Sequence, residues 1–426
     1  MKNQKDVKRI VAEMEEIVHG FVKDVDALEG GNAMRQLEEG VEEAGRQMMC
    51  ALLRAAVRRW QRTHPIEAKR CACGMDENKG PRDKDIQTRW GTIPVTRLYR
   101  RCAGCGHSDF AGDGELGIEA DGISPGLRET VTLLGTLLVF EDAAKVLHEL
   151  FGLTLSAKQV QRITEKVGDD VVKLEEEDRP VACATEDPHE GEWHFMVDAN
   201  TVHTYSGWKN VRNAVFRTPD GGTVRYVADL IDYATFGDKL RRYAASLGIR
   251  DTRKVVAVAD GLEANWKLIR VNFPGARQIL DFYHAAEHIW QAGRVVYGEG
   301  TAPCRDWCEE HCRGLKEEGP DGLLDELSRR IPRQKVPENA KALEDLQRYI
   351  QANRKRMDYP RYVSDGHPIG SGHVESACKG VTGARLKGPG MRWRVDNVRR
   401  MAHLRAIYKS GLWTQLWQQR TTAFAA

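Results

Sequence analysis

Three acidic residues stand where they could share a metal site: Asp198, Asp260 and Glu375. Asp198 follows Phe-Met-Val, Asp260 ends the run Val-Val-Ala-Val-Ala, and Glu375 follows the break Gly-Ser-Gly-His-Val. Two carboxylates at strand ends and one on a helix are what two divalent cations need to lie roughly 3.5–4 Å apart for in-line attack at phosphorus. Hard oxygen ligands in an incomplete cage favour Mg²⁺, with Mn²⁺ as a substitute. The pattern indicates cutting or joining of nucleic acid.

A second polar cluster follows the next short apolar run. It comprises Asp281-Phe-Tyr-His284, with Glu287 and His288 one helical turn further on. We assign Asp281 and His284 to the catalytic site, as groups that position substrate or the metal-binding carboxylates. His284 and His288 are four residues apart on one helical face, so a zinc pair is the alternative interpretation.

The chain turns basic after Glu375, and a Gly-Pro-Gly sequence divides this region into two helical segments. Basic side chains next to a metal site are typical of proteins that follow a phosphate backbone, and an interleaved tryptophan can stack on a base. A solvated basic face is the alternative. The residues that we expect to contact DNA here are Lys379, Arg385, Lys387, Arg392, Trp393 and Arg394.

The elements that must position the carboxylates form a mixed α/β pattern. Alternating residues predict strands at 193–205, 211–217 and 223–232, and apolar runs predict strands at 254–259 and 278–280. Helices are expected at 236–247, from residue 263, and at 285–296. Three antiparallel strands, a crossover helix and then strands alternating with helices form the order of a ribonuclease-H-like fold. The run 175–178 before it, which is all acidic, is expected to be a linker.

Residues 300–360 are charged and helical with several prolines, so they predict a helical insertion between the second and third carboxylates. Cys304, Cys308 and Cys312 fall on one face of a helix there. We expect a stripe of small apolar side chains in a core, and a metal site together with His311 is the alternative.

The N-terminal region is predicted to be helical. Residues 1–65 have helical spacing of apolar residues, which indicates a packed hairpin or, alternatively, a dimerisation helix. Residues 141–150, Gly152 and residues 156–167 reproduce helix, glycine turn and helix. A short structural hairpin is one interpretation, and a DNA-binding helix-turn-helix is the other. In the second, Lys158, Gln159 and Arg162 would contact DNA.

Two cysteine pairs flank a predicted hairpin, with a polar loop before the alternating residues 93–99. Cys71 and Cys73 form the first pair, and Cys102 and Cys105 form the second, each pair followed by glycine. This spacing indicates a zinc ribbon. The alternative is a ribbon that its hairpin alone holds together, with His107 as a substitute ligand.

Composition limits the class of protein. At 426 residues with a net charge of +2, the chain predicts more than one domain and places any affinity for nucleic acid in local patches. There is no apolar run long enough to span a membrane, and the first twenty residues are charged throughout. Ten cysteines are too few for a disulfide scaffold. We therefore expect a cytoplasmic protein with no membrane partner.

Three strings resemble a known family. They are Gln-Ile-Leu-Asp281-Phe-Tyr-His-Ala-Ala-Glu-His288, Ile-Gly-Ser-Gly-His-Val-Glu375-Ser-Ala-Cys378-Lys and Arg385-Leu-Lys-Gly-Pro-Gly-Met-Arg-Trp393. They are similar to bacterial insertion-sequence DDE transposases of the ISKra type, in the Mutator-like group. The resemblance implies that Asp198, Asp260 and Glu375 fill the DDE positions. It also implies that the protein binds terminal inverted repeats, cleaves a strand, and transfers the freed 3′-hydroxyl into target double-stranded DNA. Such a protein is expected to associate with the bacterial nucleoid.

The expected fold is multidomain α+β. It starts with N-terminal helices (1–65), a zinc-ribbon-like module (66–112) and a helix-turn-helix-like region (113–185). A ribonuclease-H-like α/β core (186–300), a helical insertion (301–362) and the rest of the core with basic C-terminal helices (363–426) follow. We expect a homodimer or larger assembly on DNA. The alternatives are a DNA-binding relative that no longer cuts, and a ribonuclease-H-fold nuclease without strand transfer.

Overall fold

The computed structural model describes residues 2–28, 31–64, 73, 76–177, 181 and 189–424. The chain divides into two compact units, Met1–Lys166 with Trp417–Ala426, and Val167–Leu416. Both units contain helices, and each contains a sheet, so the expected mixed α and β architecture is confirmed. Within the described ranges, no helix is both long and apolar enough to cross a membrane.

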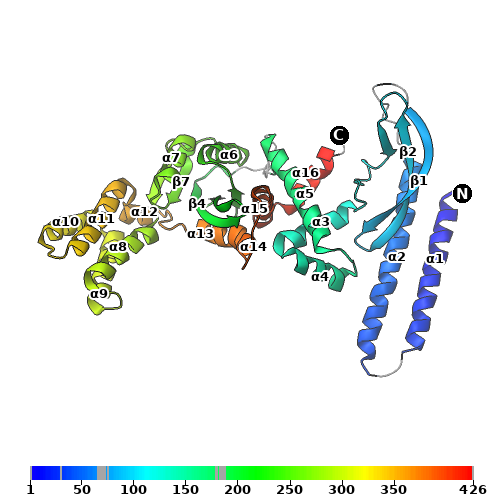
Figure 1. Ribbon diagram of the computed structural model, residues 1–426, viewed down its shortest axis with the longest axis horizontal. Coiled ribbons are helices and arrows are strands. Elements are labelled where there is room, and N and C mark those ends of the chain that lie inside the picture. Colours follow the sequence, from blue (N-terminus) through cyan, green and yellow to red (C-terminus); the bar gives the residue numbers. More distant parts are fainter. Residues whose placement is uncertain are drawn as a thin grey trace. The chain divides into compact units, whose positions relative to one another are not determined.

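The first unit begins with the predicted helical hairpin, α1 (Lys2–Asp26) and α2 (Ala33–Thr63), whose helices lie side by side (Figure 1). Asn32 precedes α2 with a φ of 77°, a left-handed conformation in which asparagine is enriched. Gly40 lies against Phe21, since a Cβ there would come within 3.3 Å of the ring. Ala51 is the one buried residue among those described in α2, so this hairpin is lightly packed.

An antiparallel sheet follows, in the order β1 (Asp76–Thr88), β2 (Gly91–Cys102) and β3 (Ser108–Ala111). Ile93 and Val95 of β2 are buried and pack against Leu53 and Val57 of α2. The polar loop expected before residue 93 is wrong for residues 76–88, which form β1. A strand needs apolar residues only on its covered face, so a polar sequence can still pair its backbone with β2.

Three helices complete the described part of this region: α3 (Pro125–Leu137), α4 (Phe140–Phe151) and α5 (Ala157–Glu176). Gly152 ends α4 at a φ of 63°, the left-handed conformation that glycine adopts at helix ends. The predicted order of helix, glycine turn and helix is therefore confirmed as secondary structure. The core between these helices is built from Leu127, Val131, Leu147, Val160 and Ile163.

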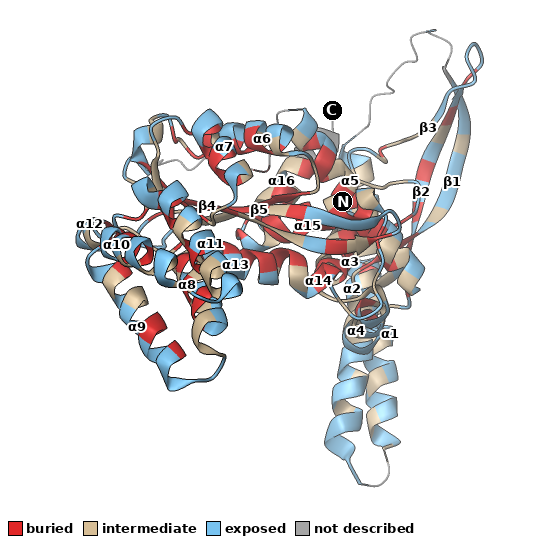
Figure 2. Cartoon of the chain, turned by 60° about the vertical axis from the view of Figure 1, so that its left-hand side comes forward, coloured by how far each residue is buried: buried red, intermediate tan, exposed pale blue. Residues whose placement is uncertain are grey.

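The second unit contains a five-stranded sheet in the order β6-β5-β4-β7-β8. The central strand β4 pairs with β5 antiparallel and with β7 parallel. At the two edges, β6 pairs antiparallel with β5, and β8 pairs parallel with β7. The strands are β4 (Trp193–Thr204), β5 (Gly207–Arg217), β6 (Val224–Asp229), β7 (Val255–Ala259) and β8 (Arg277–Leu280). All five were predicted, and Figure 2 shows the buried residues that concentrate along β4 and β5.

Helices cover both faces of this sheet (Figure 1). On one face, α6 (Tyr233–Ser246) and α7 (Glu263–Asn272) enclose the aromatic side chains of Phe195, Phe216 and Phe273. On the other lie α13 (Gly372–Ala377), the π-helical segment Cys378–Gly383, α14 (Ala384–Leu386) and α15 (Val395–Lys409). The last helix is α16 (Trp413–Phe424). Successive residues of a strand alternate between its faces, so odd residues of β4 meet α6 and α7 and even ones meet the α13 side.

The residues expected to form a helical insertion are helical, and they lie between β8 and α13. After α8 (Phe282–Tyr297) come α9 (Ala302–Glu317), α10 (Asp321–Arg330), α11 (Pro337–Asn353) and α12 (Tyr359–Ser364). Both α9 and α11 pack against α8. Cys304 and Cys308 are buried in this packing, as expected for a core stripe, and burial raises the pKa of the Cys308 thiol to about 12.

The expected linker at 175–178 is wrong for its first two residues, because α5 continues to Glu176. Glu175 pairs with Lys239 of α6, and Lys239 Nζ also lies 3.1 Å from Asp229 of β6. His403 Nε2 and Arg399 Nε of α15 lie 2.9 and 3.0 Å from Asp229. These ion pairs hold α5, α6, β6 and α15 together, so the acidic run contributes to a buried network.

Candidate active site

Asp198 and Asp260 lie next to each other across two neighbouring strands. The parallel pairing of β4 with β7 ends at Val197 and Ala259, and each aspartate is the next residue of the chain. Neighbouring strands are about 4.8 Å apart, so this register places the two backbones within the reach of one shared ion. The apolar run before each aspartate forms the strand that brings it there.

Asp198 is partly buried on the sheet face that α13 covers. Its carboxylate accepts hydrogen bonds from the backbone N–H of Ala199 at 2.6 Å and from the Cys378 thiol at 3.6 Å. Burial raises the pKa of Asp198, and the negative charge of Asp260 raises it further. A carboxylate that is repelled by its neighbour is one that a cation between them would stabilise.

Asp260 is oriented by the start of α7. Its Oδ1 accepts hydrogen bonds from Leu262 N at 3.1 Å and from Asn265 Nδ2 at 2.8 Å. The residue after Asp260 is a glycine because the site has no room for a side chain: a Cβ at Gly261 would come within 2.5 Å of the Tyr349 ring. Tyr349 belongs to α11, so the helical insertion reaches the second aspartate.

Glu375 lies in α13, which packs against β4 and β5. Its side chain is 63% exposed, and Lys379 Nζ lies 2.7 Å from Oε1. The hydrogen bond from Lys379 and its positive charge lower the pKa of Glu375, and His284 adds a smaller effect in the same direction. Within the described ranges, only a set of cysteines brings three His, Cys, Asp or Glu ligand atoms within 4.8 Å of one another, so the three carboxylates are not closed into a tight set.

Asp281 is buried and holds the segment that leads to Glu375. It caps α8 through Tyr283 N at 2.7 Å and His284 N at 3.3 Å. Its other oxygen accepts from Ser371 N at 2.7 Å and from the Ser371 hydroxyl. Ser371 immediately precedes α13, so Asp281 fixes where that helix begins. This geometry makes Asp281 a positioning residue.

His284 lies near the carboxylates. Its ring is 44% exposed, with Nδ1 3.6 Å from Glu287 Oε2, and its charge affects the pKa of both Asp198 and Glu375. His288 points elsewhere and stacks on Tyr349 with ring centroids 3.7 Å apart. The two histidines therefore have different surroundings, which offers no support for the zinc-pair interpretation.

A polar network, which our sequence analysis did not predict, joins the sheet to the helix of Glu375. Asn200 Nδ2 donates to the Cys378 carbonyl at 2.8 Å, and Thr382 Oγ1 donates to Asn213 Oδ1 at 2.7 Å. Cys378–Gly383 is π-helical, so its backbone carbonyls have different hydrogen-bond partners from those of an α-helix. Side chains of β4 and β5 therefore supply hydrogen bonds to polar groups of this segment. Asn200 is two residues after Asp198, on the same strand face, and that spacing was the one available signal.

The basic region after Glu375 is only partly exposed. Lys387, Arg392 and Arg394 face solvent, and Lys379 does so while paired with Glu375. Arg385 and Trp393 are only 2% and 8% exposed, so the expectation that they meet DNA is wrong for this conformation. The guanidinium of Arg385 lies 5.1 Å from the Trp393 ring, and Trp393 Nε1 donates to Leu386 O. The two side chains stabilise the turn between α14 and α15.

The predicted helix-turn-helix residues lie in the first turns of α5. Lys158 and Arg162 are exposed. Gln159 is a capping residue: its Oε1 accepts from Ser156 N at 2.9 Å, and Gln159 N donates to Ser156 Oγ at 3.3 Å. This reciprocal pair is a capping box, so the carboxamide of Gln159 already has a structural role.

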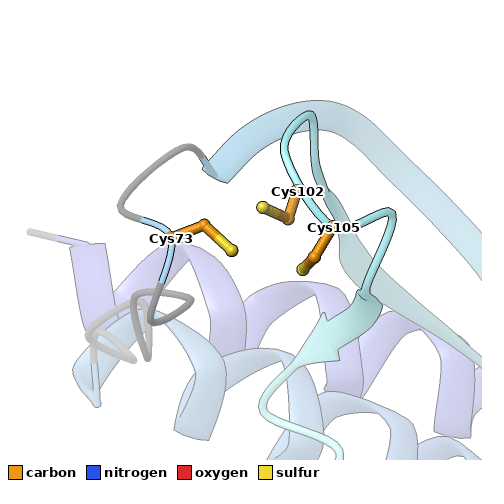
Figure 3. Close-up of side chains that lie close together, drawn as sticks. All are labelled: Cys73, Cys102 and Cys105. Atoms are coloured by element: carbon orange, nitrogen blue, oxygen red, sulfur yellow. The ribbon is translucent and has the colours of Figure 1, made fainter.

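Three cysteines gather where β2 turns into β3. The sulfur atoms of Cys73, Cys102 and Cys105 lie within 4.8 Å of one another, and Figure 3 shows them pointing toward one another. Gly104 lies beside the cluster, since a Cβ there would be in ordinary contact with Cys73 Cβ at 3.4 Å. His107 does not join the cluster. Cys71, the fourth predicted ligand, lies outside the described residues.

Comparison with protein-family models finds no match for this chain, and comparison with curated protein sequences finds none either.

Proposed function

We propose that this chain is a Mg²⁺-dependent DNA transposase of the DDE type. One observation carries the proposal: Asp198 and Asp260 come directly after the last paired residues of the parallel strands β4 and β7, and the helix of Glu375 packs on β4 and on β5, the other neighbour of β4. A sheet order of β6-β5-β4-β7-β8, with β5 antiparallel to both neighbours, supports a ribonuclease-H-like core. The resemblance of the three sequence strings supports transposition over other reactions of such a core.

The donor set fits a hard divalent cation. Asp198 and Asp260 offer carboxylate oxygens with like-charge repulsion between them, and Glu375 supplies a third carboxylate from α13. Bound Mg²⁺ would polarise the scissile phosphate and favour deprotonation of the attacking water or 3′-hydroxyl. The chain holds its carboxylates in place through Asn265 at Asp260 and through Cys378 and the Ala199 N–H at Asp198.

DNA would be bound by exposed cations in each unit. Lys387, Arg392 and Arg394 follow the helix of Glu375 in the second unit, and Lys158 and Arg162 begin α5 in the first. Ion pairs with phosphates release counterions, so these residues would supply salt-dependent affinity. Lys379 would contribute once it has left Glu375.

We also propose that the thiolates of Cys73, Cys102 and Cys105 hold Zn²⁺. Three sulfurs that point toward one another match the thiolate-rich ligand sets of structural zinc sites. The Zn²⁺ would hold the loop between β2 and β3 against the segment that precedes β1. Its role would be structural, separate from the carboxylates.

Cleavage of the DNA that flanks the gene tests the proposal. Labelled duplex carrying these flanks is incubated with the protein in Mg²⁺ and in EDTA, for wild type and for Asp198→Asn, Asp260→Asn and Glu375→Gln. Asp238→Asn, an exposed aspartate of α6, is the matched control. We expect metal-dependent nicking and joining at the element boundary, lost in the three variants and kept in the control while duplex binding persists.

Other outcomes would lead to other functions. Specific binding without nicking in Mg²⁺ or Mn²⁺ would indicate a DNA-binding relative that does not cut. Nicking without strand transfer would indicate a nuclease. Cleavage that survives all three carboxylate substitutions would rule out the proposed site.

A further inference from the structure

The α1–α2 hairpin exposes a continuous apolar surface. Figure 2 shows the hairpin as exposed and half-buried along most of its length. Several apolar residues of α1 recur at intervals of four and seven, which places them on one side of the helix. We name the following residues the apolar stripe: Val7, Val11, Val18 and Val22 of α1, and Met34, Val41, Met49 and Leu52 of α2, each at least 43% exposed.

The two halves of the stripe lie on the same side of the hairpin. A groove of about 630 Å³ runs between the helices near their open end, and Val7 and Ile10 line it together with Leu52 and Ala56. The neighbouring side of α2 is already covered, since Leu53 and Val57 pack against the strands. The stripe is therefore a free apolar face next to a packed one.

Charge is divided along the hairpin. The half near the open end is basic, through Lys8, Arg9, Arg54, Arg58, Arg59 and Arg62, and residues 52–63 contain no acid. The half near the turn has more acids than cations: Lys23, Arg35 and Arg46 stand against Glu15, Glu16, Asp24, Asp26, Glu38, Glu39, Glu42 and Glu43, although Arg35 pairs with Glu39, and Arg46 with Glu42 and Glu43. The basic open end of one hairpin is thus complementary in charge to the acidic turn end of a second copy.

We propose that two copies of this chain pair through their apolar stripes, with the hairpins antiparallel, to form a four-helix bundle. A two-fold axis across the middle of the hairpin would place the acidic half of each copy on the basic half of the other. A helix the length of α2 is about 46 Å long at 1.5 Å per residue, which gives room for the usual size of a stable interface. The pairing does not depend on whether the chain cuts DNA.

Charge also argues against nucleic acid as the occupant of the stripe. A duplex lying along the hairpin would meet the acidic half, where its phosphates would be repelled. A second copy covers valines and methionines and pairs both charged halves at once. A parallel pair would juxtapose like charges at each end.

Sedimentation of the full chain without DNA tests the pairing. We expect wild type to dimerise with concentration, and Val11→Glu and Val18→Glu each to weaken association by about tenfold or more, since each buries an unpaired charge in the interface. Ala12→Glu is the matched control, because Ala12 is exposed on α1 away from the stripe. It should change association by less than about twofold, and circular dichroism should show equal helix content in all variants.

Charge reversal then tests the antiparallel arrangement. The variants Lys8→Glu/Arg59→Glu and Glu38→Lys/Glu42→Lys should each self-associate about tenfold more weakly than wild type, and their equimolar mixture should recover wild-type association. A parallel bundle is already repulsive in wild type, so neither reversal would weaken it. A wild-type chain that stays monomeric up to its solubility limit, or a Val18→Glu variant that pairs like Ala12→Glu, would overturn the proposal.

Discussion

Asp281 gives the most direct test of how the chain places Glu375. Replacing it with alanine removes the cap of α8 and leaves the buried Ser371 N–H without its acceptor. Loss of an aspartate cap costs about 1 kcal/mol, and an unsatisfied buried amide costs about 1–3 kcal/mol more. We therefore expect Asp281→Ala to lower the free energy of unfolding by about 2–4 kcal/mol.

Asp232 supplies the matched control. It caps α6 in the same way, through Ala234 N and Thr235 N at 2.9 Å each, but it is exposed, and these bonds stay within its own helix. Asp232→Ala should cost only about 1 kcal/mol. The difference between the two variants measures the hydrogen bonds to Ser371.

Urea titration of the full chain gives the stability, and Mg²⁺-dependent cleavage under conditions where the variant is folded gives the effect on the site. We expect Asp281→Ala to require more Mg²⁺ for half-maximal cleavage than Asp232→Ala, because α13 begins at Gly372, directly after Ser371. Equal losses of stability in the two variants, together with equal Mg²⁺ dependence, would refute the idea that Asp281 positions the helix of Glu375.

Three other predictions concern charge and metal. Elemental analysis should find about one zinc per chain, lost in Cys102→Ser and Cys105→Ser but kept in Cys50→Ser, which is outside the cluster. Lys379→Met should reduce the Mg²⁺ concentration needed for half-maximal cleavage at saturating DNA by up to about fivefold, because an exposed ion pair with Glu375 is worth at most about 1 kcal/mol. An unchanged Mg²⁺ requirement would mean that Lys379 does not compete with the cation for Glu375. For Asp229, burial opposes ionisation, but the charges of His403 and Lys239 outweigh it and lower the pKa well below its usual range. A pKa lowered by folding stabilises the fold above the unfolded value of about 3.9 and loses that contribution as pH falls, so urea titrations should show a loss of stability below about pH 4 that is smaller in Asp229→Asn.

Much of the second unit could be predicted because its buried strands leave a strong pattern. The parallel strand β7 is a continuous apolar run that ends in Asp-Gly, and β4 alternates up to Asp198. These patterns predict the strands, and the ribonuclease-H-like order expected of them places the two aspartates on neighbouring strands. Glu375 could be placed on a helix by the glycines before it, but its contact with Lys379 depends on side-chain geometry that no spacing encodes.

The misses share a physical cause, which is that burial of polar side chains depends on distant partners. Glu175 looks like part of a solvated acidic run until Lys239 is brought beside it, and Arg385 looks like a DNA contact until Trp393 covers it. The sequence of β1 is polar and has no apolar run that would predict a strand, whereas its partner β2 has the alternating apolar residues. Local sequence predicts a helix or a strand, whereas the tertiary neighbours of a charged side chain determine whether it is buried or exposed.

The hydrogen bonds between Asp281 and Ser371, with Phe282 N donating to Ile369 O at 2.8 Å, also close a long excursion of the chain. The helices α8 to α12 all lie between these two points. The entropy of closing such a loop rises slowly, by about 0.6 kcal/mol for each doubling of its length. The closure entropy alone would therefore change little if the excursion were longer or shorter. The place at which the chain returns toward the sheet would stay the same.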